Sequence, residues 1–298
     1  MAQTTQNAIL APNGTLARVL VFQLCHADTD PLPGLGALCA EFDSTRHVLG
    51  LGLPFCARLG AAIDGLRAFP ALAGAGCAVP STQGALFCAL LGDDRGDLLH
   101  ASRRVTQLLG AGFRVAEVVD MFTYREGRDL SGYIDGTENP QDQAAVDAAV
   151  VHGRGPGLDG GSFVAVQRWV HDFDALAAKT QAGRDAIIGR SAATNQELGD
   201  APASAHVKRA AQESFEPPAF LLRRSMPYVG ADESGLFFVA YGESLERFER
   251  VLRRMLGLTD GVVDALFEFT RAVSGGYYFC PPLHDGRIDL RAMTSGRE

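Results

Sequence analysis

Apolar residues along the chain gather in short runs that are separated by glycine, proline and charged positions. Residues 18–24 and 162–170 are rich in branched and aromatic side chains, which is typical of buried strands. The same criterion predicts further strands at 82–91, 113–124, 220–224, 235–241 and 277–280. None of these runs approaches the roughly 18 consecutive apolar residues that indicate a membrane span, so none is expected.

Helical spacing is clearest between residues 245 and 256, where apolar side chains recur every three or four positions and form one stripe. Ser244 can cap the first turn of this helix, and Gly257 can end the last one. Further helices are predicted over 98–109, over 262–272 and in a segment that ends near residue 190.

The order of these elements bears on the fold class. Strands and helices follow one another in mixed order, twice over, which favours an α+β protein of two sheet-and-helix units. The chain has 298 residues, of which 47% are hydrophobic and 21% charged, so it can bury one large core or two smaller ones. The pattern leaves the order of the strands open.

Charge and cysteine content narrow the function classes. The formal net charge is −8, whereas a nucleic-acid-binding protein normally carries a basic patch, so no nucleic-acid partner is expected. The first seven residues lack the basic region and apolar core of a secretory signal, and the cytoplasm is therefore expected. The six cysteines form no CxxC pair, zinc spacing or CxxCH haem-attachment motif, which indicates small core residues.

The stretch 128–140 concentrates turn-forming residues around one acid. Asp135 lies within a GxxDG pattern that begins at Gly132, and an Asn-Pro pair follows. Asp-Gly and Asn-Pro are common in turns, and glycine adopts unusual backbone angles without strain, so the local pattern alone favours an ordinary turn. A carboxylate held in such a turn is also a candidate for chemistry.

The histidines offer one candidate metal ligand. Those at positions 26, 47, 100, 152, 171 and 284 lie in predicted loops or near element ends without a second ligand at chelating spacing, which favours structural or surface roles. His206 follows a polar loop after a predicted helix. A single histidine holds a metal firmly only when something else supplies the other ligands, as in haem proteins. Taken alone, His206 has no better claim than the other six.

Two adjacent arginines form the third candidate element. Arg223 and Arg224 lie on a predicted strand that breaks at Pro227. Alternation sends their side chains to opposite faces, so one can point inward, where it needs an anionic partner, while the other meets solvent. An edge strand with two solvated charges explains the pair equally well.

Taken together and in order, these segments resemble the dye-decolourising peroxidase family, specifically its class B members. The matching segments are 132–140 with the GxxDG motif, 161–172, 187–190, 205–207, 222–228, 235–241 and 269–279. GxxDG alone is unspecific, but the ordered set is highly specific. The resemblance covers about residues 113–282 well and is looser over the N-terminal third.

The resemblance implies a fold and a cofactor. The fold is α+β, with two ferredoxin-like units of the dimeric α+β barrel type, antiparallel sheets and flanking helices. The first unit spans 1–145 and carries GxxDG at its end, and the second spans 146–298 and binds haem b. His206 would be the iron ligand and Arg190 a partner of a haem propionate. Gly136, Thr137 and Glu138 would also contact the haem.

The resemblance likewise implies the catalytic groups. Asp135 would move a proton between the oxygens of hydrogen peroxide, and Arg223 would stabilise negative charge on the departing oxygen. Ser225 stands where many class B enzymes carry asparagine. An acidic partner is expected for the second nitrogen of His206, with a slight preference for Asp264 over Glu268. Leu252, Met255 and Phe267 are candidates for the haem pocket wall, although an ordinary core role explains them too.

The implied activity is that of a haem peroxidase that reduces hydrogen peroxide and oxidises small aromatic or dye-like one-electron donors. Two alternatives remain at this point. One is a haem-binding or haem-storage protein, and the other is a porphyrin- or haem-processing enzyme of the deferrochelatase type. Homo-oligomers are common in the family, so one is expected here. The sequence leaves the physiological donor and any surface radical site open.

Overall fold

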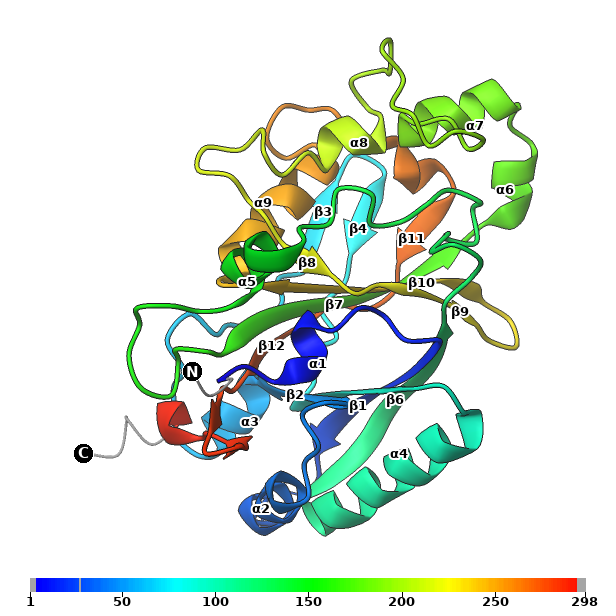
Figure 1. Cartoon of the computed structure of the whole chain (residues 1–298). Coiled ribbons are helices and arrows are strands. Elements are labelled where there is room, and N and C mark those ends of the chain that lie inside the picture. Colours follow the sequence, from blue (N-terminus) through cyan, green and yellow to red (C-terminus); the bar gives the residue numbers. More distant parts are fainter. Residues whose placement is uncertain (1–3, 27, 294–298) are drawn as a thin grey trace.

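The computed structural model describes residues 4–26 and 28–293. Its main feature is a ten-stranded sheet in the order β11-β7-β12-β2-β5-β1-β6-β9-β10-β8. β7 also pairs with β10, which closes the sheet on itself. Helices cover the outside of this closed sheet at two opposite ends (Figure 1).

The N-terminal half of the sheet has the order of a ferredoxin-like unit. Its elements are β1 (Leu16–Leu24), α2 (Leu32–Ala40), β2 (His47–Gly52), β5 (Leu86–Gly92), α4 (Arg95–Leu109) and β6 (Phe113–Phe122). The strands lie side by side as β2-β5-β1-β6, and all three pairings are antiparallel. This β-α-β-β-α-β connection is that of the ferredoxin-like motif.

The C-terminal half repeats this arrangement. Its elements are β7 (Ser162–His171), α6 (Phe173–Ala177), α7 (Gln181–Ile188), α8 (His206–Arg209), β8 (Leu222–Arg223), β9 (Met226–Val229), β10 (Ser234–Gly242), α9 (Leu245–Met255) and β12 (Gly276–Cys280). β8 and β9 both pair with β10 and act as one interrupted strand. The order β12-β7-β10-β8/β9 is that of the first half, and β2–β12 and β6–β9 pairing joins the two halves.

These pairings confirm the α+β fold of two ferredoxin-like units. The boundary expected between residues 145 and 146 falls inside the short helix α5, and the division of the chain there stays a prediction. The remaining elements are α1 (Asn7–Leu10), α3 (Leu53–Arg58), β3 (Leu72–Gly74), β4 (Cys77–Val79), α5 (Asp142–Ala149), β11 (Thr270–Ala272), β13 (Leu283–His284), β14 (Arg287–Ile288) and the 3-10 turns at Gly110–Gly112, Ala265–Glu268 and Arg291–Met293.

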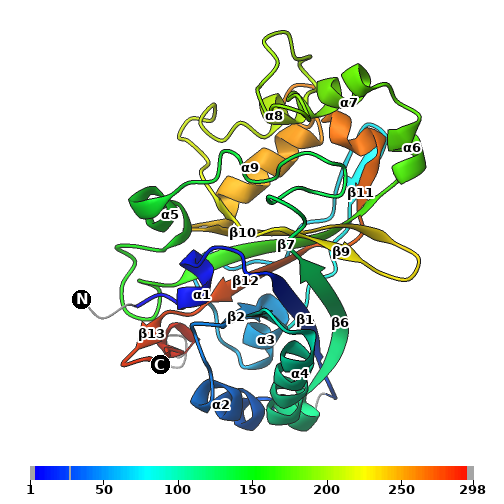
Figure 2. The same ribbon diagram turned by 45° about the vertical axis from the view of Figure 1, so that its right-hand side comes forward.

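Alternation along the strands builds two core layers. One set of side chains, among them Val19, Val164, Phe237 and Tyr278, fills the inside of the closed sheet. The opposite faces of the strands pack against the helices (Figure 2). The described part of the chain contains no helix of the length and apolar character that a membrane crossing needs.

Several local predictions need correction. The helix expected over 262–272 is wrong, because Asp264 caps only the short turn Ala265–Glu268 and Thr270 then pairs with His171 as a strand. The strand expected over 82–91 starts at Leu86, and only two residues of the 220–224 run pair as a strand. The helix α9 is confirmed, although the side chain of Ser244 makes no capping bond.

Candidate active site

The GxxDG stretch forms a short hairpin after β6. The amide of Asp135 donates to the carbonyl of Gly127 (3.0 Å), and that of Asp129 donates to the carbonyl of Tyr133 (2.8 Å). Gly132 has φ of +96° in the turn, a conformation that favours glycine. The turn predicted from the sequence is therefore present, and its ladder leads directly to Asp135.

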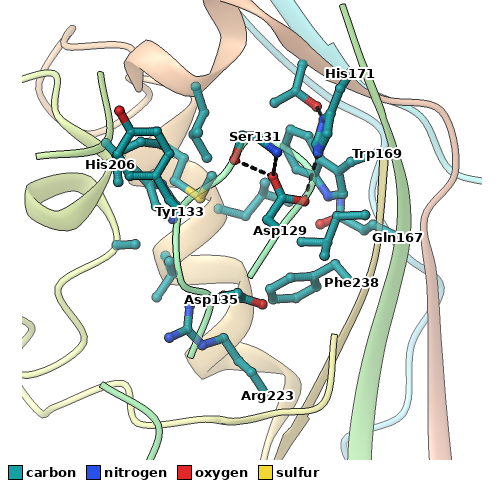
Figure 3. Close-up of a pocket in the computed structure, with 18 of the residues that line it drawn as sticks. Asp129, Ser131, Tyr133, Asp135, Gln167, Trp169, His171, His206, Arg223 and Phe238 are labelled. Carbon is teal, nitrogen blue, oxygen red and sulfur yellow. Dashed lines mark hydrogen bonds and ion pairs between the residues drawn. The ribbon is translucent and has the colours of Figure 1, made fainter. Parts of the chain in front are cut away.

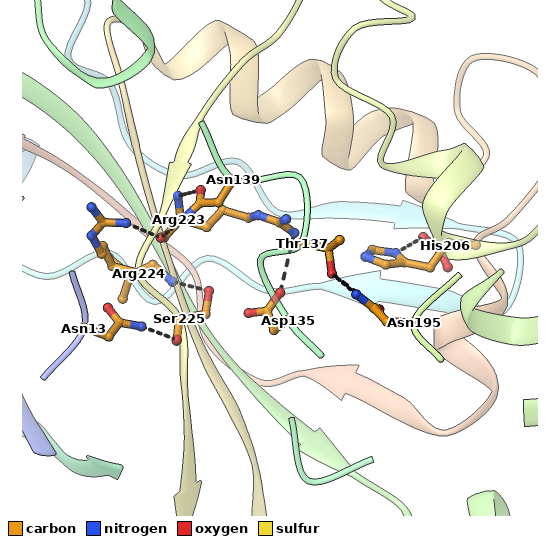
Figure 4. Close-up of polar contacts among 11 residues, drawn as sticks. Asn13, Asp135, Thr137, Asn139, Asn195, His206, Arg223, Arg224 and Ser225 are labelled. Atoms are coloured by element: carbon orange, nitrogen blue, oxygen red, sulfur yellow. Dashed lines mark hydrogen bonds and ion pairs between the residues drawn. The ribbon is translucent and has the colours of Figure 1, made fainter. Parts of the chain in front are cut away.

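Asp135 lies next to Arg223 of β8. An Nη1 of Arg223 is 3.6 Å from Oδ1 of Asp135, and the two side chains are 16% and 26% exposed. Asn139 ties the same loop to β8, because its Oδ1 accepts from the Arg223 amide (2.8 Å) and its Nδ2 donates to the Arg223 carbonyl (2.9 Å; Figure 4). The inward arginine therefore has the anionic partner that it needs.

Arg224 points to the other face, as alternation predicted, but it does not stand free in solvent. Its guanidinium donates to the carbonyls of Leu10 (2.8 Å) and Arg223 (3.1 Å), and the residue is partly buried. Burial lowers the pKa of Arg224 from its ordinary value. The expected solvated position is therefore wrong, because the end of α1 lies against this face and accepts a hydrogen bond from Arg224.

His206 begins α8 and has a buried acidic partner. Its Nδ1 lies 2.8 Å from Oδ2 of Asp264, whose side chain is fully buried, and Oδ1 of Asp264 accepts from the amide of Leu266 (2.8 Å). The slight preference for Asp264 is confirmed, since Glu268 instead pairs with Lys179 (2.5 Å). With Nδ1 engaged, Nε2 is the nitrogen left for a ligand.

A cavity that is partly open to solvent connects these residues. Asp135, His206 and Arg223 line it together with Asp129, Gln167, Trp169, His171, Leu236, Phe238, Phe248, Val251, Leu252 and Met255 (Figure 3). Leu252 and Met255 are thus wall residues as predicted. Phe267 does not belong to this wall and packs on Trp169, with ring centroids 5.5 Å apart.

The cavity fits a haem. Its walls are largely apolar, which is typical of ligand sites in proteins. A single imidazole with one free nitrogen enters it from α8. One axial imidazole is enough to hold iron where a porphyrin supplies the other ligands.

Ser225 lies outside this cavity. It lines a second, more polar cavity, which shares Asp135, Arg223 and Leu236 with the first. The hydroxyl of Ser225 accepts from the amide of Val239 (3.3 Å), and its carbonyl accepts from Asn13 (3.0 Å; Figure 4). A catalytic role for Ser225 stays a prediction.

The other expected cofactor contacts form a polar cluster beside the cavity. Arg190 pairs with Glu138 (2.6 Å) and Glu197 (3.3 Å), and Thr137 accepts from Asn195 (3.0 Å). Arg190, Thr137 and Glu138 are not among the residues that line the first cavity, and Gly136 lines the second one. Their roles toward a cofactor also stay predictions.

His171 was assigned a structural or surface role, and the structure places it in the cavity wall. Its side chain is 5% exposed, and its Nε2 is 3.0 Å from Oδ1 of Asp129. Gln167, Trp169 and His171 occupy alternate positions of β7 and share the cavity face. Two polar residues at alternate positions of a buried strand were the signal that could have identified this face.

The chain is similar to a known protein family, to individual members of it and to solved structures. The family model described as "Dyp-type peroxidase, C-terminal" matches residues 126–285. A dye-decolorizing peroxidase from Mycolicibacterium paratuberculosis is 30% identical over 72% of this chain and 63% of its own length. One from Mycobacterium tuberculosis is 29% identical over 87% of this chain and 80% of its own length. The chain thus spans less than two thirds of the first relative.

Solved structures agree with these matches. A dye-decolorizing protein from Vibrio cholerae has a TM-score of 0.84 and 29% identity, with 92% of this chain and 96% of that chain covered. A variant of DypB from Rhodococcus jostii in complex with heme has a TM-score of 0.83 and 28% identity, with 92% and 95% covered. The fold of this chain is therefore that of the structural class to which these proteins belong.

Within this class, the chain can be assigned to one family. The matched segment makes up more than half of the chain and contains the Asp135 hairpin, His206 and Arg223. The chain belongs to the dye-decolourising peroxidase (Dyp-type peroxidase) family.

Proposed function

We propose that the protein is a class B, haem b peroxidase that reduces hydrogen peroxide and oxidises small aromatic or dye-like one-electron donors. One observation carries the proposal. His206, backed by Asp264, and the Asp135–Arg223 pair line a single, largely apolar cavity. The absence of a CxxCH motif from the sequence supports a haem held without covalent bonds, which is the b type.

His206 would hold the iron through Nε2. The carboxylate of Asp264 accepts the Nδ1 hydrogen, which orients the ring and increases the basicity of Nε2. When bound, haem would supply the iron that binds peroxide and would hold the two oxidising equivalents of the peroxide until the one-electron donors reduce it. The apolar side chains of α9, among them Leu252 and Met255, would cover the porphyrin and exclude water.

Asp135 and Arg223 act on the peroxide. Asp135 takes a proton from one peroxide oxygen and delivers it to the other, so that water can leave. Arg223 remains positively charged and donates hydrogen bonds to the departing oxygen. Arg223 is less exposed than Asp135, and Asn139 holds its main chain, so it is the better fixed of the two.

Three further proposals concern the location of the protein, its oligomeric state and additional site residues. The cytoplasm stays the proposed location, and residues 1–3 lie outside the described residues. Family resemblance favours a homo-oligomer. Ser225, Arg190, Gly136, Thr137 and Glu138 are proposed as further site residues on the same resemblance.

The absorption spectrum of the haem-reconstituted protein tests this function. We expect a haem Soret band that changes on addition of one equivalent of hydrogen peroxide in the wild type and in His152→Ala, an exposed control histidine. In His206→Ala the band should be lost or altered. Haem binding with only slow bleaching by peroxide would favour a haem-storage or porphyrin-processing protein, and no haem binding at all would refute the proposal.

A further inference from the structure

We propose that His171 and Asp129 are positioning residues for Asp135, through a buried hydrogen bond between β7 and the GxxDG hairpin. This inference rests on the proposed function, because Asp135 is the proton-transfer group there. The contact joins segments 42 positions apart in the chain, Nε2 of His171 being 3.0 Å from Oδ1 of Asp129. Figure 3 shows it in the cavity wall, away from His206.

The rigid side of the contact is β7. This strand pairs with β10, β11 and β12 and is therefore held on both edges. The ring of His171 lies against those of Phe173 and Phe269, with centroid distances of 5.8 and 5.6 Å. Nδ1 of His171 lies 2.7 Å from Oγ1 of Thr270. Packing and hydrogen bonding thus fix the ring in one orientation.

Hydrogen counting shows that the contact is strong. Oγ1 of Thr270 donates its only hydrogen to the carbonyl of Val170 (3.0 Å), so Nδ1 of His171 must donate to Thr270. Nε2 of His171 is then the nitrogen that hydrogen-bonds to Oδ1 of Asp129, at 3.0 Å. Both side chains are largely buried, at 5% and 13% exposure, so water competes little for this hydrogen bond.

The movable side is the hairpin. Asp129 opens the turn, and its Oδ2 accepts from the amide of Ser131 (2.8 Å) and from the Ser131 hydroxyl. Two main-chain rungs, Asp129 to Tyr133 and Asp135 to Gly127, connect the turn to Asp135. A displacement of Asp129 is therefore transmitted to Asp135, whose side chain, among the residues that the structure describes, has only the 3.6 Å contact with Arg223 to hold it.

The first test compares His171→Phe in two backgrounds. Phenylalanine keeps the ring packing on Phe173 and Phe269 but removes the bond to Asp129. We expect the reaction of the haem-loaded protein with peroxide to slow by about 10-fold, since small misplacements of a reacting group have such costs. In the Asp135→Asn background the same change should have less than about 2-fold effect, because the residue acts through Asp135.

Equal losses in both backgrounds, or no loss in the wild-type background, would overturn the proposal. The control is Lys179→Ala, which breaks the exposed pair with Glu268 near the same end of β7 and should react like the wild type. If the wild type itself does not react with peroxide, the proposed function fails rather than this inference.

The second test needs no cofactor. Hydrogen exchange of the amides of Asp129 and Asp135 in the haem-free protein should become faster in His171→Phe and stay unchanged in Lys179→Ala. Asp129→Asn serves as the conservative variant, because its amide can donate to Nε2 of His171 while its oxygen still accepts from Ser131. We expect slow exchange and a peroxide rate within about 3-fold of wild type for Asn. Behaviour like that of His171→Phe, in either measurement, would refute positioning by hydrogen-bond geometry.

Discussion

The two ferredoxin-like units share one strand order, but they differ in the hollow between sheet and helix, which is wide open beside α4 of the N-terminal unit and more enclosed beside α9 of the C-terminal unit. In the N-terminal unit, α4 lies directly on β1, β5 and β6 and buries Leu98, Val105 and Leu109. In the C-terminal unit, α9 lies over β7 and β10 in a similar way (Figure 2), yet residues of all three elements line the cavity that holds Asp135 and His206.

The connections explain this difference. In the N-terminal unit, the crossover from β1 to β2 carries the helix α2. In the C-terminal unit, the crossover from β7 to β8 carries α6, α7 and α8, and α8 brings His206 to the cavity. The hairpin with Asp135 enters from the end of the first unit. The same topology thus makes a packed core in one unit and a site in the other.

The largest effect on the peroxide reaction is expected when the arginine of a charged pair is replaced in the C-terminal unit, and the matching replacement in the N-terminal unit should have none. Arg223→Leu is expected to slow the reaction with peroxide by on the order of 100-fold or more, because it removes a donor aimed at developing charge. Asp135→Asn should cost no more than this. Arg18 pairs bidentately with Asp120 in the N-terminal unit, at a similar exposure of 15%, and Arg18→Leu should leave the rate unchanged.

Stopped-flow absorption of the haem-loaded proteins measures these rates. A near-normal rate for Arg223→Leu would contradict the ranking of the two residues. A slowed rate for Arg18→Leu would show that the N-terminal unit also contributes to the peroxide reaction, although Arg18 does not line the cavity with Asp135 and Arg223.

A leucine pair tests the packing difference itself. Leu109 of α4 and Leu252 of α9 are both 1% exposed, but only Leu252 borders the cavity. Leu109→Ala should lower the free energy of unfolding of the haem-free protein by about 3 kcal/mol. Leu252→Ala should cost clearly less, since its cavity side has fewer neighbouring atoms to lose. Denaturant titration gives both values. Equal losses would show that Leu252 is packed as tightly as Leu109, which would argue against a cavity beside α9.

A smaller effect is expected from the acid in the cavity wall. Burial by itself raises the pKa of Asp129, but hydrogen bonds from His171 and Ser131 outweigh it and leave the pKa below the ordinary value of 3.8. Its stabilising contribution is therefore fully present above that pH and is lost as the pH falls through the lowered native pKa. The difference in unfolding free energy between the wild type and Asp129→Asn should shrink below pH 3.8. If this free-energy difference instead grew as the pH fell, the pKa of Asp129 would be raised in the folded protein rather than lowered.

The smallest change is expected at Asn139. Asn139→Ala removes two hydrogen bonds to the main chain of Arg223, which are typically worth about 1 kcal/mol each. The free energy of unfolding should fall by about that amount or twice it, and the peroxide reaction should slow less than in Arg223→Leu. Thermal unfolding and stopped-flow absorption check the two parts, and an unchanged stability would show that water replaces the amide without cost.

Local periodicity was enough to predict much of this molecule. Branched and aromatic runs predicted β1, β7 and β10, and the three-to-four spacing predicted α9, because strands and helices repeat their burial pattern every 2 and 3.6 residues. The ordered motifs led to the family and to Asp135, His206 and Arg223 as the candidate residues.

Tertiary structure alone decided which of these residues meet. The 3.6 Å approach of Asp135 to Arg223, the choice of Asp264 for His206 and the contact of His171 with Asp129 join positions 42 to 88 apart in the chain. Such contacts depend on the register of a closed sheet, where a shift by one residue turns every side chain to the other face. That register is set by the packing of both units together, which no local pattern contains.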